Sequence, residues 1–318
     1  MIEPRLNHVF CPGPAAVVQP GQPPQSLAGH RMAYWEWNAT GNPAHPHVVV
    51  CVHGLSRQGR DFDTLARALS PHMRVVCPDV VGRGQSDWLA DSMGYQIPVY
   101  VADMLALLAH LHAQTPLHTL DWVGTSMGGL IGMALCGLPD LPLPVPVRRL
   151  VLNDVGPVIE WQALQRIGQY LGQPLHFASE QQGADLLWSV SSSFGPHTPA
   201  QWLQLSRPML KRQPDGSLVL HYDPAIAVPF KAMERADAVA NEAQLWHLYD
   251  HIQARTLVLR GAQSDLLSPA TLQAMAERGP RADVVEFAGV GHAPTLIAPD
   301  QVAAVQSFLV GADGPGLQ

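Results

Sequence analysis

One serine stands where nucleophilic chemistry is possible. The segment DWVGTSMGGL, residues 121–130, places Ser126 between Gly124 and Gly128 directly after an apolar run. A strand that turns at once into a helix bends so tightly that a side chain on either flank would collide with the neighbouring backbone. Such a bend exposes the serine hydroxyl at the carboxyl end of a parallel sheet, where ligands bind. The plain alternative is an ordinary strand–helix turn, because G-x-S-x-G by itself is common.

A serine hydroxyl is a weak nucleophile at neutral pH and needs a base. Of the 15 histidines, His292 in FAGVGHAP is the best candidate, because it follows the last apolar run and stands between Gly291 and Ala293. The base in turn needs a carboxylate that fixes its tautomer. We expect this to be Asp265 in TLVLRGAQSD, with Asp154 in LVLNDVG, one strand earlier, as the alternative. If Asp265 is not catalytic, it is an acid at a helix N-terminus.

Acyl transfer passes through an oxyanion, which needs fixed N–H donors worth roughly 3–4 kcal/mol each. The backbone N–H of Met127, the first after the serine, is one expected donor. The loop after VVVCV reads His53-Gly54-Leu55, and Gly54 lets its backbone come close, so the N–H of Leu55 is the second. For His53 we expect a structural role that braces this loop, in preference to proton transfer.

The elements that position these residues alternate regularly along the chain. Uniformly apolar strands with helical patterns between them indicate a mostly parallel sheet that is covered on both faces. An aromatic, alternating stretch at 30–39 suggests an edge strand. The other predicted strands cover residues 47–54, 74–82, 119–126, 148–156, 254–265 and 282–292, and the predicted helices cover 62–70, 99–113 and 127–138.

The alternation stops between Gly156 and about residue 251. This stretch has helical patterns, a predicted hairpin turn at 213–217 and several tryptophans, but no series of buried strands. We therefore interpret it as a helical cap inserted between two core strands. The predicted division is an N-terminal extension over 1–28, loosely wrapped on the surface, a core over 29–156 and 252–318, and a cap over 157–251.

The composition excludes several classes of function. The net charge of -7, without a basic cluster, argues against a nucleic-acid binder. No apolar run reaches the roughly 18 residues of a membrane helix, and the N-terminus does not resemble a secretory signal, so we expect a cytoplasmic protein that does not bind membranes. The four cysteines form no C-x-x-C pair, which argues against a zinc site or a disulfide framework.

Five motifs in this order resemble the α/β-hydrolase superfamily. They are HGLS (53–56), PDVVGRGQSD (78–87), GTSMGG (124–129), RGAQSD (260–265) and GVGHAP (289–294), and the resemblance extends over about residues 30–310. It implies the α/β-hydrolase fold, a doubly wound sheet with a helical cap. The motifs are most similar to those of bacterial carboxylesterase-like serine hydrolases.

The resemblance also implies roles for individual residues. It implies Ser126, Asp265 and His292 as a catalytic triad, with Leu55 and Met127 as the oxyanion donors. It further implies that Arg83 and Gly84, in VVGRGQSD, form a structural turn beside the site.

The expected activity is hydrolysis of carboxylic esters with short to medium acyl groups or of aromatic esters, through an acyl-enzyme. The partners are then a small-molecule ester and water, and neither a metal nor a cofactor is expected. As substrate contacts we predict Trp161 and Trp188 of the cap, and Arg57 just after the oxyanion loop. For Arg57 the alternative to a contact with a carboxylate or polar substrate group is a surface salt bridge.

Two other functions use the same fold. Carbon–carbon bond hydrolases of ring-cleavage products share the triad, but they tend to have an SGPGG-like oxyanion loop and a Trp after the histidine. Here the loop reads HGLS and the histidine is followed by Ala293. A non-catalytic small-molecule receptor is the third reading, and it would bind ligand without turnover. Dehalogenases and epoxide hydrolases use Asp as nucleophile, where this chain has Ser126.

Overall fold

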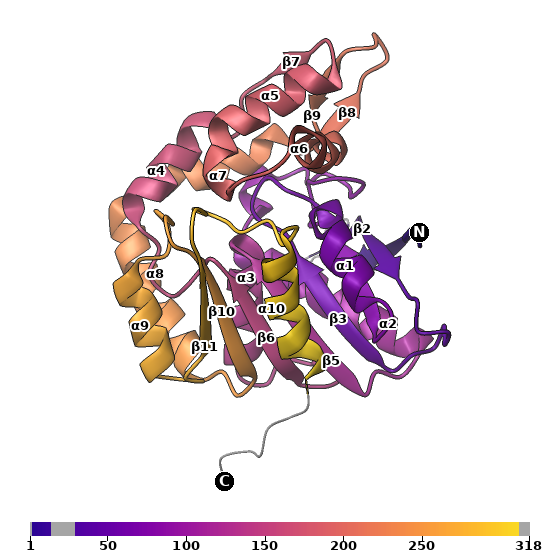
Figure 1. Ribbon diagram of the computed structural model, residues 1–318, viewed down its shortest axis with the longest axis vertical. Coiled ribbons are helices and arrows are strands. Elements are labelled where there is room, and N and C mark those ends of the chain that lie inside the picture. The colour runs from indigo at the N-terminus through magenta and orange to yellow at the C-terminus, as the bar shows by residue number, and fades with distance from the viewer. Residues whose placement is uncertain (1, 14–28, 312–318) are drawn as a thin grey trace, which may run out of the picture.

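The computed structural model describes residues 2–13 and 29–311. Their centre is a sheet of eight strands (Figure 1). Six of the strands are parallel, and the remaining two, β1 and β2, lie at one side of the sheet and pair antiparallel. The parallel sheet and its interrupted alternation with helices confirm the expected α/β-hydrolase fold. In spatial order the strands are β1 (Arg5–Cys11), β2 (His30–Trp37), β4 (Arg74–Pro78), β3 (His47–Val52), β5 (Thr119–Thr125), β6 (Val147–Asn153), β10 (Arg255–Gly261) and β11 (Asp283–Phe287).

Helices cover both faces of this sheet, which explains why its strands are apolar throughout. In β3, Val48 and Val50 point into one core and Val49 and Cys51 into the other. Side chains alternate across a strand, so a strand between two helical layers is apolar at every position. One face carries α2 (Ile97–Gln114), α3 (Met127–Gly137), α8 (Arg235–Asp250) and α9 (Pro269–Glu277), and the other carries α1 (Asp63–Leu69) and α10 (Pro299–Val310).

The N-terminal segment differs from the prediction of a loose surface extension. Residues Arg5–Cys11 form β1, which pairs antiparallel with β2. The segment 30–39 is therefore not an edge strand, because β1 covers its outer side. Val9 and Cys11 are buried and the intervening Phe10 is exposed. This alternation covers too few residues to be recognised in the sequence beside the Pro- and Gln-rich segment that follows. Residues 14–28 of the predicted extension lie outside the described residues.

A cap lies over one end of the sheet (Figure 1), and its residues come between β6 and β10 in the sequence. The predicted hairpin turn is present: Gln213 N–H donates to the Ser217 carbonyl at 2.8 Å, between β8 and β9. A small sheet in the order β7-β9-β8 was not expected. The cap elements are α4 (Trp161–Tyr170), β7 (His176–Phe177), α5 (Glu180–Ser191), α6 (Pro199–Ser206), β8 (Leu210–Arg212), β9 (Leu218–Leu220) and α7 (Ala227–Ala232).

The last helix of the predicted cap, α8, contacts a helix of the core. Helix α8 packs on α3 so closely that a Cβ on Gly137 would lie 2.1 Å from the Leu248 carbonyl oxygen. The end of α8 is therefore in contact with the core, and the predicted division at residue 251 stays a prediction. Short 3-10 helices complete the chain at Gly59–Phe62, Ser92–Gly94, Ser192–Phe194, Arg207–Met209 and Pro224–Ile226. Within residues 2–13 and 29–311, none of the helices combines the length and the apolar character that a membrane span requires.

The docking of β1 generates a prediction about stability. Val9→Ala removes buried side-chain volume and should lower the free energy of unfolding by about 2 kcal/mol. Phe10→Ala, at a side chain that is 66% exposed on the same strand, is the matched control and should change it by less than about 0.5 kcal/mol. Urea unfolding of both variants measures the difference. Equal effects would show that β1 does not pack in solution as described.

Candidate active site

Ser126 lies in the sharp turn between β5 and α3. Its backbone has φ +51° and ψ -115°, a conformation that non-glycine residues rarely adopt and that is found at functional sites. A Cβ on Gly124 would lie 2.2 Å from the Gly128 carbonyl oxygen, and one on Gly128 would lie 2.0 Å from that of Val52. Both flanking positions therefore require glycine, for the steric reason expected from the sequence.

His292 lies within hydrogen-bond distance of the serine. Its Nε2 is 3.1 Å from the Ser126 Oγ, and its Nδ1 is 2.7 Å from the Asp154 Oδ2. The three side chains form one hydrogen-bonded series, in which the imidazole can accept the serine proton while its other nitrogen donates to a carboxylate. The structure thus brings Ser126 and His292 together, as expected, although they are 166 residues apart.

The prediction that Asp265 is the acid next to His292 is wrong. Asp265 is 47% exposed and binds Arg166 of the cap, accepting from Nε at 2.7 Å and from Nη2 at 3.0 Å. Asp154, the alternative, directly follows β6, and β6 lies beside the strand that carries Ser126. The loop after β10 turns outward before Asp265, so its carboxylate is directed to the cap.

Asp154 is held as a hydrogen-bond acceptor by its surroundings. Its side chain is fully buried, and its Oδ1 accepts from the Gly261 N–H at 2.8 Å. Its Oδ2 accepts from the Ser264 hydroxyl at 2.6 Å in addition to His292. The motif RGAQSD therefore contributes to the site through Gly261 and Ser264, which orient the acid, and not through its own aspartate.

His53 supports the loop after β3. It is fully buried, its Nδ1 donates to the Gly54 carbonyl at 2.7 Å, and its Nε2 accepts from the Val80 N–H at 3.0 Å. Both ring nitrogens are therefore occupied by backbone groups. Burial lowers the pKa of His53 to about 3, so the ring is neutral near pH 7. These contacts agree with the expected structural role.

Arg83 connects the two segments that carry the expected oxyanion donors. Its buried guanidinium donates from Nε to the Leu55 carbonyl at 2.8 Å and from Nη2 to the Met127 sulfur at 3.7 Å. Nη1 donates to the Tyr100 hydroxyl at 3.0 Å, and the Gly84 N–H donates to the His221 carbonyl at 3.0 Å. The turn implied by the resemblance is thus present. The donor roles of the Leu55 and Met127 amides stay predictions.

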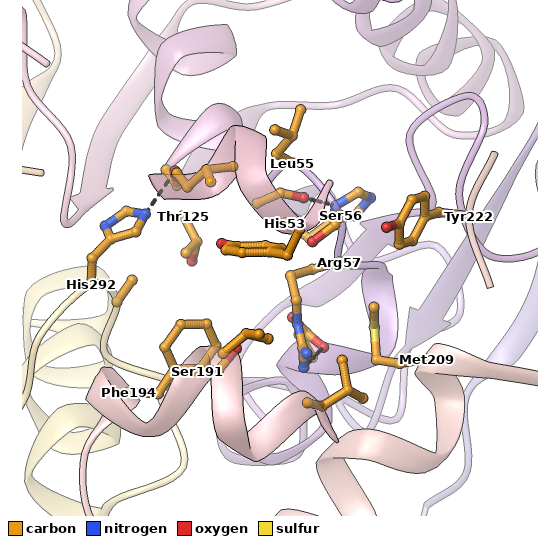
Figure 2. A pocket seen from close by; sticks show the side chains of 18 of the residues that line it. His53, Leu55, Ser56, Arg57, Thr125, Ser191, Phe194, Met209, Tyr222 and His292 are labelled. Carbon is orange, nitrogen blue, oxygen red and sulfur yellow. Dashed lines mark hydrogen bonds and ion pairs between the residues drawn. The ribbon is translucent and has the colours of Figure 1, made fainter. Parts of the chain in front are cut away.

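A cavity of about 310 Å³ opens beside Ser126, between the core and the cap (Figure 2). The core contributes the loop after β3, the serine turn and the segment from His292 to Thr295. The cap contributes mainly apolar side chains that the sequence did not single out, including those of Leu187, Phe194 and Met209.

Neither cap tryptophan that was predicted to contact substrate lines this cavity, so both predictions are wrong. Trp161 borders a separate surface pocket beside Phe230, and Trp188 packs edge-on against Trp202 with ring centroids 5.0 Å apart. On α5 the cavity-lining residues are 186, 187, 190 and 191, which share one side of the helix, and Trp188 lies outside that side. Which positions line the cavity depends on the orientation of each cap helix, and that orientation depends on how the cap packs on the core.

Arg57 does line the cavity, and the salt bridge that was its alternative interpretation is also present. It pairs with Asp61, which lines the same cavity. The pair is not on the outer surface, since the Arg57 side chain is only 10% exposed. Desolvation raises the pKa of Asp61, and Arg57 opposes this shift.

One group of side chains in the described residues has metal-ligating atoms close together, within 4.8 Å: Cys11, His30 and Asp103. It lies between β1, β2 and α2, on different elements from the serine turn. His30 Nε2 is 2.9 Å from the Asp103 Oδ2, and burial raises the pKa of the Cys11 thiol. The hydrogen bonds give these residues a structural role, and the absence of a metal cofactor stays a prediction.

The chain belongs to the alpha/beta hydrolase family, whose model matches residues 49–305. It is 49% identical to a "3-hydroxybutyrate-oligomer hydrolase" of Cupriavidus necator, an alignment that covers 97% of this chain and 99% of the relative. It is 30% identical to the "Putative carbamate hydrolase RutD" of Yersinia enterocolitica, covering 84% of this chain and 88% of that one. These two relatives support a hydrolase activity for this chain.

Solved structures agree with this assignment. An alpha/beta hydrolase from Novosphingobium aromaticivorans superimposes with a TM-score of 0.78 and 32% identity, covering 98% of this chain and 99% of that one. A "Putative Hydrolase" from Rickettsia typhi gives a TM-score of 0.82 at 26% identity, covering 97% and 100%.

The choice between the two acids can be tested by serine reactivity. Asp154→Asn should slow labelling of Ser126 by a fluorophosphonate by about 10³–10⁴-fold, because the amide stabilises the wrong imidazole tautomer. Asp265→Asn is the matched control and should change the rate less than about threefold, since exposed ion pairs contribute little. Labelling is followed by intact-protein mass spectrometry. A larger loss in Asp265→Asn than in Asp154→Asn would overturn the assignment.

The burial of His53 predicts a dependence of stability on pH. Because its pKa falls from 6.5 to about 3 on folding, the unfolded chain binds a proton between these values that the folded chain does not. Stability is thus lost as pH falls from about 6.5 toward 3, by up to about 1.4 kcal/mol per pH unit.

His53→Gln should flatten this slope in urea unfolding between about pH 6 and pH 4, where the charge difference is largest. His72→Gln, at an exposed histidine, serves as control and should leave the slope unchanged. An unchanged slope in His53→Gln would mean that His53 titrates normally in the folded protein.

Proposed function

We propose that this protein is a serine hydrolase of carboxylic esters whose substrates are short oligoesters of the 3-hydroxybutyrate type. The observation that carries the chemistry is the hydrogen-bonded series from Asp154 through His292 to Ser126, which opens into the cavity. The substrate class is supported by the relative that is 49% identical along nearly the whole of both chains.

In the acylation step, the Ser126 Oγ attacks the ester carbonyl carbon while His292 Nε2 accepts the serine proton. The carbonyl oxygen becomes an oxyanion, which the N–H groups of Leu55 and Met127 stabilise. Collapse of this intermediate breaks the carbon–oxygen bond of the ester, and the alcohol leaves with the proton from His292. The negative charge of Asp154 stabilises the imidazolium that exists between the two proton transfers.

In the deacylation step, water takes the place of the alcohol. His292 accepts a proton from water as the water oxygen attacks the acyl carbon, and it returns that proton to the Ser126 oxygen when the acyl–serine bond breaks. The products are a carboxylic acid and the free enzyme. All proton transfers occur on one imidazole nitrogen, because the other remains hydrogen-bonded to Asp154.

The cavity supports a preference for small acyl groups. Its volume of about 310 Å³ is near the lower end of the usual range for ligand pockets, and its cap wall is largely apolar. A short acyl chain fits within such a space and can contact the apolar cap side chains. We therefore propose esters with short acyl groups, a narrower class than the short to medium acyl or aromatic esters expected from the sequence.

The proposal predicts the outcome of an ester series. Wild-type protein should hydrolyse p-nitrophenyl acetate and butyrate better than the palmitate, and should cleave a 3-hydroxybutyrate trimer. Ser126→Ala should lower both activities by about 10⁴-fold or more, because the nucleophile is lost. Ser189→Ala, on the exposed side of α5, is the control for handling and folding.

Two results would contradict the proposal. A folded wild-type protein that hydrolyses none of these esters is not an esterase of this kind. If Ser126→Ala retains most of the activity, the turnover does not depend on the serine. Circular dichroism and unfolding of each variant establish that the proteins compared are folded.

A further inference from the structure

An ion pair stands in the wall of the cavity, close to the nucleophile. Arg57 donates from Nε to the Asp61 Oδ2 at 2.6 Å and from Nη2 to the Asp61 Oδ1 at 2.8 Å. Both residues line the cavity beside Ser126. The mechanism of ester cleavage gives this pair no task.

The pair is positioned by the loop that carries Leu55. The Arg57 N–H donates to the Gly54 carbonyl at 3.1 Å. A Cβ built on Gly54 would lie 3.7 Å from the Ser126 Cβ and 3.8 Å from the Arg57 Cγ, so the serine and the arginine border the same small space. Figure 2 shows the Arg57 side chain extending into the cavity between Phe194 and Met209. An acyl group on Ser126 therefore shares the cavity with the pair.

Stability does not explain a charged pair at this place. Arg57 faces apolar side chains of the cap, and its guanidinium carbon is 6.0 Å from the centroid of the Phe194 ring. Buried ion pairs are often no more stabilising than apolar residues of the same size, because both charges lose their water. A neighbouring pair of the same chemistry, Arg60 with Asp63, lies outside the cavity lining.

The charges of the pair indicate which ligand group it fits. The positive and negative charges cancel, so a substrate carboxylate that gains from Arg57 is repelled by Asp61. Among the described residues, the side-chain hydrogen bonds of Arg57 all end on Asp61 and start from Nε and Nη2, which leaves Nη1 as a donor. The Asp61 carboxylate has further acceptor positions. A neutral donor such as a hydroxyl can use these acceptor positions without placing a further charge beside the pair.

We propose that Arg57 and Asp61 bind the 3-hydroxyl group on the acyl part of the substrate and thereby select 3-hydroxyacyl esters over unsubstituted acyl esters. The hydroxyl donates to a lone pair of the Asp61 carboxylate that Arg57 leaves free, and the two hydrogen bonds from Arg57 hold that carboxylate in position. This inference rests on the proposed function, because it assumes an acyl group on Ser126. An acyl chain without the hydroxyl desolvates the Asp61 carboxylate without supplying this donor, which disfavours it.

The test compares three esters that differ only at carbon 3 of the acyl chain: ethyl 3-hydroxybutyrate, ethyl 3-methoxybutyrate and ethyl butyrate. Hydrogen bonds to charged groups predict a kcat/KM for the hydroxy ester about ten- to a hundredfold above that for ethyl butyrate. The methoxy ester accepts but cannot donate, so it should lose most of this preference. These ratios are internal to each enzyme and do not depend on the active fraction.

The double variant Arg57→Met with Asp61→Leu replaces the pair by apolar side chains without leaving one charge unpaired. It should bring the hydroxy-to-butyrate ratio to within about threefold of one, because the carboxylate that accepts from the hydroxyl is gone. The matched control is Arg60→Met with Asp63→Leu, a pair on the same segment whose residues do not line the cavity, and it should keep the wild-type ratio.

Asp61→Asn nearly preserves the shape of the side chain and provides a test if the double variant does not fold. It removes the negative charge and leaves Arg57 unneutralised. Its kcat/KM for monoethyl succinate, relative to ethyl butyrate, should therefore rise about tenfold or more over wild type. No rise would show that Asp61 does not screen Arg57 from the acyl group, and would overturn the inference.

The outcomes separate this inference from the proposed function. If wild type cleaves none of the ethyl esters and no 3-hydroxybutyrate trimer, the proposed function itself fails. If wild type cleaves them without preferring the hydroxy ester, or if the double variant keeps the preference, only the assignment of Arg57 and Asp61 is wrong. If the ratio collapses equally in the Arg60 and Asp63 control, the effect is a general disturbance of the loop, and the assignment is also wrong.

Discussion

The site depends on the crowding of backbone around Ser126. The turn from β5 into α3 passes so close to the end of β3 that only glycine fits at position 128, against the Val52 carbonyl. This packing holds Ser126 at φ +51°, and the Ser126 N–H donates to the Asn153 carbonyl at 3.0 Å. The strain is maintained because three neighbouring strands surround the turn. A serine so constrained keeps its hydroxyl at the mouth of the cavity.

The partners of the serine come from the same end of the sheet. Asp154 follows β6 directly, and Asn153 donates to the Thr125 hydroxyl at 2.9 Å and to the Pro294 carbonyl at 2.8 Å. One strand end thus holds the acid, the serine turn and the segment of His292. The cap also contacts that segment, since His197 Nε2 is 2.8 Å from the Thr295 hydroxyl. The geometry of the base therefore depends on both the core and the cap.

Much of this arrangement could be predicted from the sequence, and what could not be predicted has physical reasons. Ser126 and His292 stand next to glycines just after apolar runs, so strand ends and sharp turns identify them. Asp265 has a similar setting, but spacing does not reveal the direction in which a loop leaves the sheet; Ser264 turns inward and Asp265 outward. Trp188 was misplaced because the side of a cap helix that faces the cavity depends on docking.

The most direct test of a Ser126 acyl-enzyme is reaction with β-butyrolactone. Attack by the Ser126 Oγ on the lactone carbonyl opens the ring and leaves a 3-hydroxybutyryl ester on the serine, the intermediate proposed for the oligoesters. Acid quenching followed by peptide mapping with mass spectrometry locates the ester. We expect a single acylation on Ser126, absent in Ser126→Ala. Acylation at another residue, or none in a protein that turns over the oligoester, would contradict it.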